Sequence, residues 1–443
     1  MSRSAHASGA LRPKPTIALG GADVFHLVGD RRMRAERLGA NQCALVLHLD
    51  GRIAPAKLRR RMAKAITVEP HLGVTLQAPL LRPPRWIPSS RKTNFLTVIE
   101  TPDDISLVLE GLFAKSFTND DEPWRLLLLR GSERDALAFV WFHPFTDAKG
   151  AQRILRWFGS GTDDDLTPLP HDVRLRSHPE ALDSLDQKSR LALARTYNDH
   201  ILGFAKRPIL SLRGASAEKP IGRMRFERFV VDPSETKTLD KSIRARAKLA
   251  ESSVMIVAAA RMLDHALRRR GFAPTHHMIP VPLSLDPKGE SGRLFGNHLT
   301  MMMFSLERDD LLDERKAIAS LAEQQRAIVR DKLDLAMSAA LELVRVLPPR
   351  LYHGLATLPF GGELSSLIFS NPGVIAIDDF AGLPVLDAYA VPSVVPRPGI
   401  EVIVNRHRGA LSVLLGYFDG LVPEAEARMM AGELRARLFG DPS

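Results

Sequence analysis

The chain has very little cysteine and no long hydrophobic run. Cys43 is the single cysteine among 443 residues, so no intrachain disulfide can form, and this usage is typical of a reducing compartment. The longest apolar run, residues 254–260, is far too short to span a bilayer. Residues 1–15 lack the apolar stretch of a signal peptide, and their Ser, Ala, Gly and Pro content predicts a loose tail. We therefore expect a cytoplasmic protein.

Several motifs of well-defined chemistry are also missing. The sequence contains no Gly-x-Ser-x-Gly elbow, no P-loop and no dinucleotide fingerprint. Its histidines show no metal-ligand spacing, and the adjacent His276 and His277 would point apart in an extended strand. Cys43 lies in a strand pattern over residues 43–47, which favours a buried structural thiol over a nucleophile. We expect no metal and no redox cofactor.

The composition is that of a globular protein, with 45% hydrophobic and 25% charged residues and a net charge of +10. Arginine clusters occur at residues 31–34, 59–61 and 268–270. Solvated helix faces are the simplest interpretation of these clusters. The alternatives are attraction of an anionic donor such as coenzyme A or a carrier-bound phosphopantetheine, and contact with an anionic membrane surface. Nucleic acid is not expected as a partner, because no recognised binding motif accompanies the charge.

One short segment combines a histidine with a nearby carboxylate. Residues 137–142 form an aromatic-rich apolar run that predicts a buried strand, and His143 follows it directly. Pro144 blocks continuation of the strand ladder, and a helical pattern begins just after Asp147. A histidine at the end of a strand is well placed to meet a substrate in a cleft.

The spacing His143-x-x-x-Asp147 resembles the signature of the chloramphenicol-acetyltransferase-like superfamily. That superfamily includes peptide-synthetase condensation domains, plant alcohol acyltransferases and bacterial wax ester synthase/diacylglycerol acyltransferases. Further segments are similar to the wax ester synthases and occur in the same order: Asp-Glu-Pro-Trp at 121–124, Val-Pro-Leu-Ser-Leu at 281–285, Phe-Gly-Asn-His at 295–298 and Ser-Asn-Pro-Gly at 370–373. The resemblance covers nearly the whole chain, from about residue 24 to residue 438.

The resemblance implies roles for particular residues. His143 would be the general base that removes the acceptor's proton, a task that suits an imidazole with a pKa near neutrality. Asp147 would fix the loop through a salt bridge to an arginine, although it could also be the N-cap of the helix that follows. Four residues lie in segments similar to the central channel and are candidate substrate-binding residues, with ordinary turns as the alternative for the Gly-Asn and Asn-Pro-Gly pairs: Asn297, Ser305, Ser370 and Asn371.

Three residues depart from the pattern of the superfamily. Phe142 replaces the first histidine of His-His-x-x-x-Asp-Gly, Ala148 replaces its glycine, and Asp286 stands where the wax ester synthases place arginine. Neighbours on a strand face opposite ways, so Phe142 should affect packing more than chemistry. Ala148 would be strained if the superfamily glycine has a positive φ. Asp286 leaves open which basic group pairs with Asp147.

The chain length favours two domains, and the predicted strands and helices are mixed in two similar halves. We therefore expect an α/β (α+β) protein. The resemblance implies two stacked lobes with a tunnel between them. We place the N-terminal lobe at residues 20–165, a linker and crossover helix at 166–222, and the C-terminal lobe at 223–443.

The function expected from the resemblance is acyl transfer from a thioester, either acyl-coenzyme A or a carrier-bound acyl group, to an alcohol. The expected partners are small-molecule donors and acceptors; a carrier protein and peripheral membrane contact remain open. One alternative is a stand-alone condensation domain that joins a carrier-bound acyl group to an amine. Another is an inactive scaffold that only binds, for which Phe142, Ala148 and Asp286 are the grounds.

Overall fold

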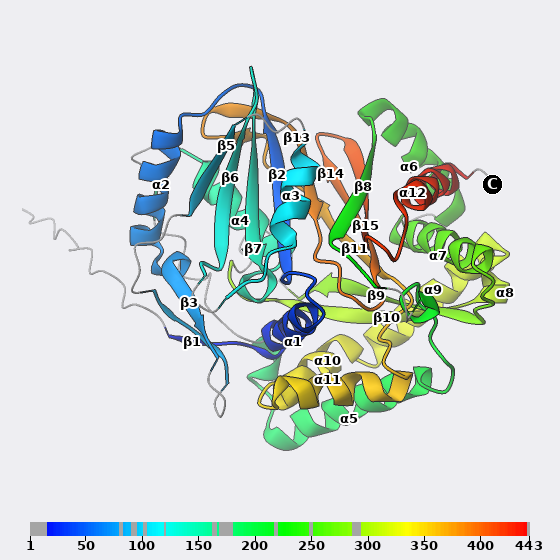
Figure 1. Cartoon of the computed structure of the whole chain (residues 1–443). Helices are drawn as coiled ribbons and strands as arrows, with labels where there is room; N and C mark the ends of the chain where they lie inside the picture. The colour runs from blue at the N-terminus through cyan, green and yellow to red at the C-terminus, as the bar shows by residue number, and fades with distance from the viewer. Residues whose placement is uncertain are drawn as a thin grey trace, which may run out of the picture.

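Two mixed α/β lobes lie side by side in the protein (Figure 1). The computed structural model describes residues 16–440, apart from 79–82, 90–94, 101–103, 119–120, 162–165, 168–179, 217–219, 248–250 and 286–293. The N-terminal tail and Asp286 therefore lie outside the described residues.

The first lobe contains a six-stranded sheet with the order β12-β13-β2-β7-β6-β5. Its strands are β2 (Gln42–Leu49), β5 (Leu96–Glu100), β6 (Trp124–Arg130), β7 (Asp135–Phe142), β12 (Asp379–Phe380) and β13 (Leu383–Val391). Strands β6 and β7 pair antiparallel as a hairpin. Every residue of β7 is buried because both faces of the sheet are covered. Helices α2 (Pro55–Val68) and α4 (Ala148–Gly159) cover one face, and α3 (Ile105–Phe113) covers the other.

A small sheet and a helix complete this lobe. Strands β1 (Ile17–Ala18), β3 (Val74–Gln77) and β4 (Arg85–Pro88) pair in the order β1-β4-β3. Helix α1 (Gly21–Ala35), which the sequence patterns did not predict, packs against the turn that carries His143 and against helices of the second lobe.

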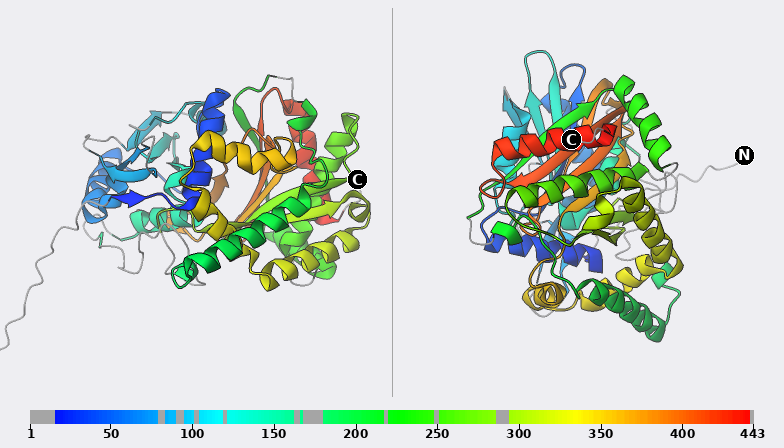
Figure 2. Two further views of the ribbon diagram at one scale, coloured as in Figure 1. Left: turned by 90° about the horizontal axis from the view of Figure 1, so that it is seen from below. Right: turned by 90° about the vertical axis from the view of Figure 1, so that its right-hand side faces the viewer.

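The second lobe is built on a four-stranded sheet with the order β11-β14-β15-β8. Its strands are β8 (Met224–Val231), β11 (Ile368–Val374), β14 (Ile400–His407) and β15 (Ala410–Phe418). Helices α6 (Pro233–Ala247), α7 (Glu251–Arg269) and α12 (Glu424–Phe439) cover its outer face, where Figure 2 shows α7 and α12 side by side. The apolar residues 254–260 of α7 are all buried, as is expected of a helix that is apolar on every side.

A hairpin and a group of helices close the second lobe. The hairpin consists of β9 (His276–Ser284) and β10 (Leu299–Glu307). The helices are α5 (Gln187–Phe204), α8 (Arg308–Leu311), α9 (Glu314–Arg330), α10 (Leu333–Val344) and α11 (Pro349–Thr357). Helix α10 ends before the two prolines at 348–349, and α11 begins at them, because proline is well suited to the first turn of a helix.

Strands β12 and β13 come late in the chain but belong to the sheet of the first lobe. β13 pairs antiparallel with β2, and the chain then returns to the second lobe as β14. The sequence patterns did not identify β12 or β13, since Pro384 and Asp387 interrupt the expected alternation. The lobe boundaries stated above, near residues 165 and 222, remain a prediction. The sheet of the first lobe, however, contains strands from both the N-terminal and the C-terminal part of the chain.

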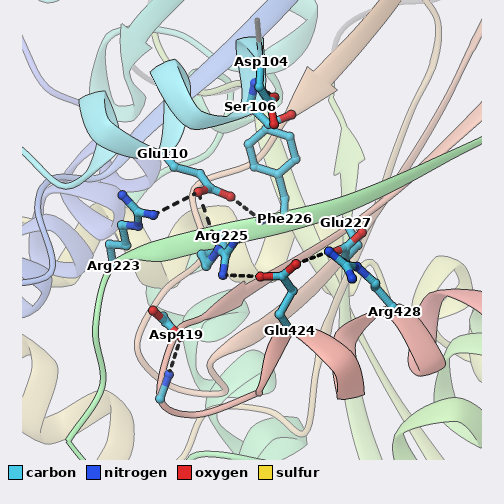
Figure 3. A network of polar contacts seen from close by, with 11 residues as sticks. Asp104, Ser106, Glu110, Arg223, Arg225, Phe226, Glu227, Asp419, Glu424 and Arg428 are labelled. Atoms are coloured by element: carbon cyan, nitrogen blue, oxygen red, sulfur yellow. Dashed lines mark hydrogen bonds and ion pairs between the residues drawn. The ribbon is translucent and has the colours of Figure 1, made fainter.

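Charged residues of α3, β8 and α12 also join the two lobes (Figure 3). The Glu110 carboxylate of α3 lies 3.5 Å from Nε of Arg225 on β8, and Oε1 of Glu110 accepts a hydrogen bond from the Phe226 amide at 3.4 Å. Nη1 of Arg225 also donates to Glu424 of α12 at 2.9 Å. Burial raises the pKa of Glu110, while Arg225 and Arg223 act in the opposite direction.

Candidate active site

Strand β7 ends at Phe142 and is held on both sides there; on the side of β6, the Phe142 amide donates to the carbonyl of Pro123 at 2.8 Å. The His143 amide donates to the carbonyl of Asn41 at 2.9 Å, which extends the pairing of β7 with β2 by one residue. Pro144 then turns the chain into a short 3₁₀ segment, His143–Phe145, so the ladder ends here as predicted. Phe142 points away from His143 and stacks on Phe117 with 4.1 Å between ring centroids. The prediction that Phe142 serves packing is confirmed.

The His143 turn is bound to the loop between β9 and β10. The Gly296 amide donates to the carbonyl of Phe145 at 2.8 Å, and the Thr146 hydroxyl donates to the carbonyl of Leu294 at 2.6 Å. The Asn297 side-chain amide donates to the carbonyl of His143 at 2.9 Å. The second lobe therefore fixes the backbone that carries the candidate base.

Asn297 is itself held by a buried carboxylate from α1. Oδ1 of Asp23 accepts from the Asn297 backbone amide at 2.7 Å and from its side-chain amide at 2.9 Å. Burial raises the pKa of Asp23 to about 7, against the opposing effect of the hydrogen bonds from Asn297 and Gly20. Asp23 was not predicted as a site residue, because nothing in the sequence places α1 next to the loop at 294–298.

Asp147 caps α4 and reaches the same loop. One of its carboxylate oxygens accepts from the Gly150 amide at 2.8 Å, and the other accepts from the His298 amide at 3.0 Å. The N-cap interpretation is confirmed. Among the described residues no arginine pairs with Asp147, so main-chain N–H groups stand where the resemblance implied a salt bridge. Ala148 begins α4 and is not among the described residues with positive φ, so it carries no strain of the kind considered above.

A second histidine lies against the candidate base. His26, on α1, stacks on His143 with 3.5 Å between ring centroids and 12° between ring planes. The side-chain amide of Asn41 donates to the His26 carbonyl at 2.8 Å, which ties α1 to β2. Burial lowers the pKa of both imidazoles, and proximity to His143 lowers that of His26 further. Both rings are therefore held in the neutral form near pH 7, the form in which a histidine can accept a proton.

A cavity of about 610 Å³ lies between the lobes and is lined by both histidines. Its walls come from α1, β2, the end of β7, the β9–β10 hairpin, the helices α5, α10 and α11, and the strands β11 and β14. Most of the lining is apolar, with residues such as Leu299, Met301, Met303, Met337, Leu341 and Phe360. Basic side chains also line it, including Arg32, Lys149 and Arg397. A cavity of this size can enclose a small-molecule substrate.

Of the four predicted substrate-binding residues, two line the cavity and two do not. Ser370 and Asn371 line the cavity; Oδ1 of Asn371 accepts from the Gly373 amide at 3.0 Å, so Asn371 also shapes the turn. Asn297 lies behind His143 and positions its backbone. Ser305 does not line the cavity. It shares a strand face with Met301 and Met303, which line the cavity, as does Met278 opposite it on β9; the Ser305 amide donates to the side chain of Gln324 at 2.9 Å.

No described helix is both long enough and apolar enough to cross a membrane. Within the same residues, no three His, Cys, Asp or Glu side chains are grouped so that they could hold a metal ion.

Comparison with known proteins shows similarity in structure but not in sequence. No protein-family model matches the chain, and no curated protein matches it. The trichothecene 15-O-acetyltransferase of Fusarium sporotrichioides matches with a TM-score of 0.73 at 13% identity, over 98% of this chain and 97% of that chain. The first condensation domain of the calcium-dependent antibiotic synthetase matches with a TM-score of 0.68 at 14% identity, over 97% of each chain.

A third solved structure shares the same arrangement. It is the starter condensation domain of rhizomide synthetase, a mutant in complex with C8-CoA and Leu-SNAC. It matches with a TM-score of 0.66 at 13% identity, over 97% of this chain and 95% of that chain. At such identities the likeness establishes a common fold.

Proposed function

We propose that this chain, which has the two-lobed fold of the chloramphenicol-acetyltransferase-like superfamily, transfers an acyl group from a thioester to an alcohol. The observation that carries the proposal is the placement of His143: its imidazole lies at the cavity between the lobes and is kept neutral by burial, and its backbone is fixed by Asn297.

The proposed reaction needs one base and no further protein group that changes covalently. The acceptor hydroxyl attacks the thioester carbonyl as His143 takes its proton, which forms the new C–O bond. The tetrahedral intermediate then collapses with loss of the C–S bond, and the imidazolium returns the proton to the departing thiolate. General base catalysis of this kind contributes about 10²–10⁴-fold in rate.

Basic residues at the cavity support an anionic thioester as donor. Lys149 of α4 lines the cavity, and burial lowers its pKa; the neighbouring Arg153 and Arg156 lower it further. Such a group of cations suits the phosphates of coenzyme A or of a carrier-bound phosphopantetheine. The rhizomide synthetase domain, which was solved with C8-CoA, makes an acyl-coenzyme A the first donor to test.

The two alternatives remain distinct proposals. A condensation activity would require an amine acceptor and a carrier-bound donor. An inactive scaffold has less support than the sequence suggested, because Phe142 is accommodated by packing on Phe117 and Ala148 does not have a positive φ. Asp286, the third ground for the scaffold, lies outside the described residues.

The test is release of free thiol from acyl-coenzyme A donors of several chain lengths, with alcohols and amines as acceptors. Acceptor-dependent release with alcohols is the expected result. Release only from carrier-linked donors and only with amines would replace the proposal by the condensation activity. Tight binding of donors with no release from either donor class would replace it by the scaffold.

A further inference from the structure

A buried carboxyl group faces the cavity without a partner. Glu401, near the start of β14, is 7% exposed and lines the cavity. No hydrogen bond or ion pair joins its side chain to any described residue. The carboxyl oxygens therefore open on the cavity. A carboxyl group without a hydrogen bond in largely apolar surroundings is costly, so it calls for an explanation.

The alternation of β14 explains why the side chain points inward. Val402 and Val404 belong to the core beneath α7, while Glu401 and Ile403 face the cavity. Ile368 of β11 stands beside Glu401 in register, and Ser370 stands beside Ile403. Glu401 thus places a carboxyl group in a largely apolar wall.

The location of Glu401 relative to the candidate base follows from the first sheet. Glu401 lies near Cys43, whose thiol pKa is raised mainly by burial and further by this carboxyl group. Cys43 of β2 lies two residues after Asn41, whose carbonyl accepts from the His143 amide. The carboxyl group of Glu401 and the imidazole of His143 line the same cavity.

Several amide and hydroxyl side chains line the cavity, but only one other carboxyl group does so among the described residues. Apart from Glu401, the carboxylate that lines it is Asp147, which is occupied by the amides of Gly150 and His298. Burial raises the pKa of Glu401 to about 8, so the empty site holds a carboxylic acid near pH 7. In that form it can both donate and accept a hydrogen bond, and as a carboxylate it can bind an ammonium group.

We propose that Glu401 determines acceptor specificity by binding a second polar group of the acceptor, a hydroxyl or an ammonium, while the reacting hydroxyl lies at His143. The acceptor class is therefore a diol or an amino alcohol rather than a simple alkanol. This inference rests on the proposed acyl transfer for the orientation of the acceptor, but binding at Glu401 can be measured without turnover. Glu401 undergoes no covalent change and is a binding residue.

The experiment compares three acceptors of equal chain length: a 1-alkanol, the α,ω-diol and the ω-amino alcohol. Calorimetry gives affinity, and thiol release gives kcat/KM, for the wild type, Glu401→Gln, Glu401→Leu and the control Ile403→Val. We expect the wild type to favour a bifunctional acceptor over the alkanol by about 10-fold or more, as for one buried hydrogen bond. Glu401→Leu should abolish this preference, and Ile403→Val should change all affinities by a similar factor.

The Glu401→Gln variant shows whether residue 401 binds a hydroxyl or an ammonium group of the acceptor. A hydroxyl can still bond to the amide, so the diol should retain most of its preference in Glu401→Gln, whereas an ammonium loses its counter-charge and the amino alcohol should lose about 10-fold or more. Thermal unfolding confirms that each variant is folded.

The inference is overturned if the wild type does not distinguish the bifunctional acceptors from the alkanol, or if Glu401→Leu keeps the preference. Transfer to alkanols without any preference would refute the role of Glu401 alone. Preferential binding without thiol release from any donor would refute the proposed acyl transfer and leave the binding role of Glu401 supported.

Discussion

The imidazole of His26 lies flat against that of His143, with 3.5 Å between the ring centroids. The two residues come from α1 and from the end of β7, and each is buried against the other. Because burial is the main cause of the lowered pKa of His143, His26 acts on the candidate base chiefly by excluding water. Asp147 and Asn297 act in the opposite direction and favour the protonated ring.

The first prediction concerns the pH profile of this pair. A base with a lowered pKa loses its proton at a lower pH. Wild-type kcat/KM should therefore rise with pH through a pKa below 6.5 and stay level at higher pH. His26→Ala removes the stacked ring and admits water, so the midpoint should move up towards 6.5. His26→Phe keeps an aromatic cover without a titratable group, and its profile should match the wild type. Equal shifts in the two variants would show that the charge of His26, and not burial, sets the pKa.

The second prediction concerns Ala148. Since Ala148 begins α4 without a positive φ, Ala148→Gly should bring no gain in activity and should lower the free energy of unfolding by up to about 1 kcal/mol. Urea unfolding and thiol release measure the two effects. A variant that is more stable and faster than the wild type would mean that alanine strains this turn.

The third prediction concerns Asp147, whose two oxygens accept from the Gly150 and His298 amides. Asp147→Ala loses both bonds and should lower the free energy of unfolding by about 2 kcal/mol. Asp147→Asn keeps one acceptor oxygen and should fall between the alanine variant and the wild type. Its kcat/KM profile should move to lower pH, because the carboxylate that favours the protonated His143 is gone. Equal stability of the two variants would contradict this assignment.

The fourth prediction concerns the stability contributed by Glu401. Its pKa is about 8 in the folded protein and about 4.5 when unfolded, so between these values the folded state holds a proton that the unfolded state releases. Wild-type stability therefore falls as pH rises through this window, by at most about 1.4 kcal/mol per pH unit from this group. Glu401→Gln lacks the effect, so its advantage should grow from pH 5 to pH 8 in urea unfolding. A constant difference between the two proteins would contradict the raised pKa.

The sequence predicted those parts of the site that depend on local pattern. The strand before His143, its termination at Pro144 and the cap at Asp147 follow from apolar run length, proline geometry and N-cap preference. The resemblance added the loop at 295–298, which the structure places against the His143 turn.

Other parts of the site depend on contacts between distant segments. The stacking of His26 and the bonds of Asp23 require α1 to lie beside the loop at 294–298, and no local pattern encodes that contact. Glu401 occupies a strand whose other residues read as continuous core, so its cavity-facing side was not apparent. Ser305 was assigned to the channel from its segment, but it is not among the residues that line the cavity.

The most direct test of the account measures acceptor-dependent thiol release by the wild type, His143→Ala and the control His265→Ala. His265 lies on α7 and bonds to Glu433, away from the cavity lining. The account predicts a loss of about 10²–10⁴-fold in His143→Ala with unchanged thermal unfolding, and wild-type rates in His265→Ala. Wild-type rates in a folded His143→Ala protein would contradict the assignment of His143 as the general base.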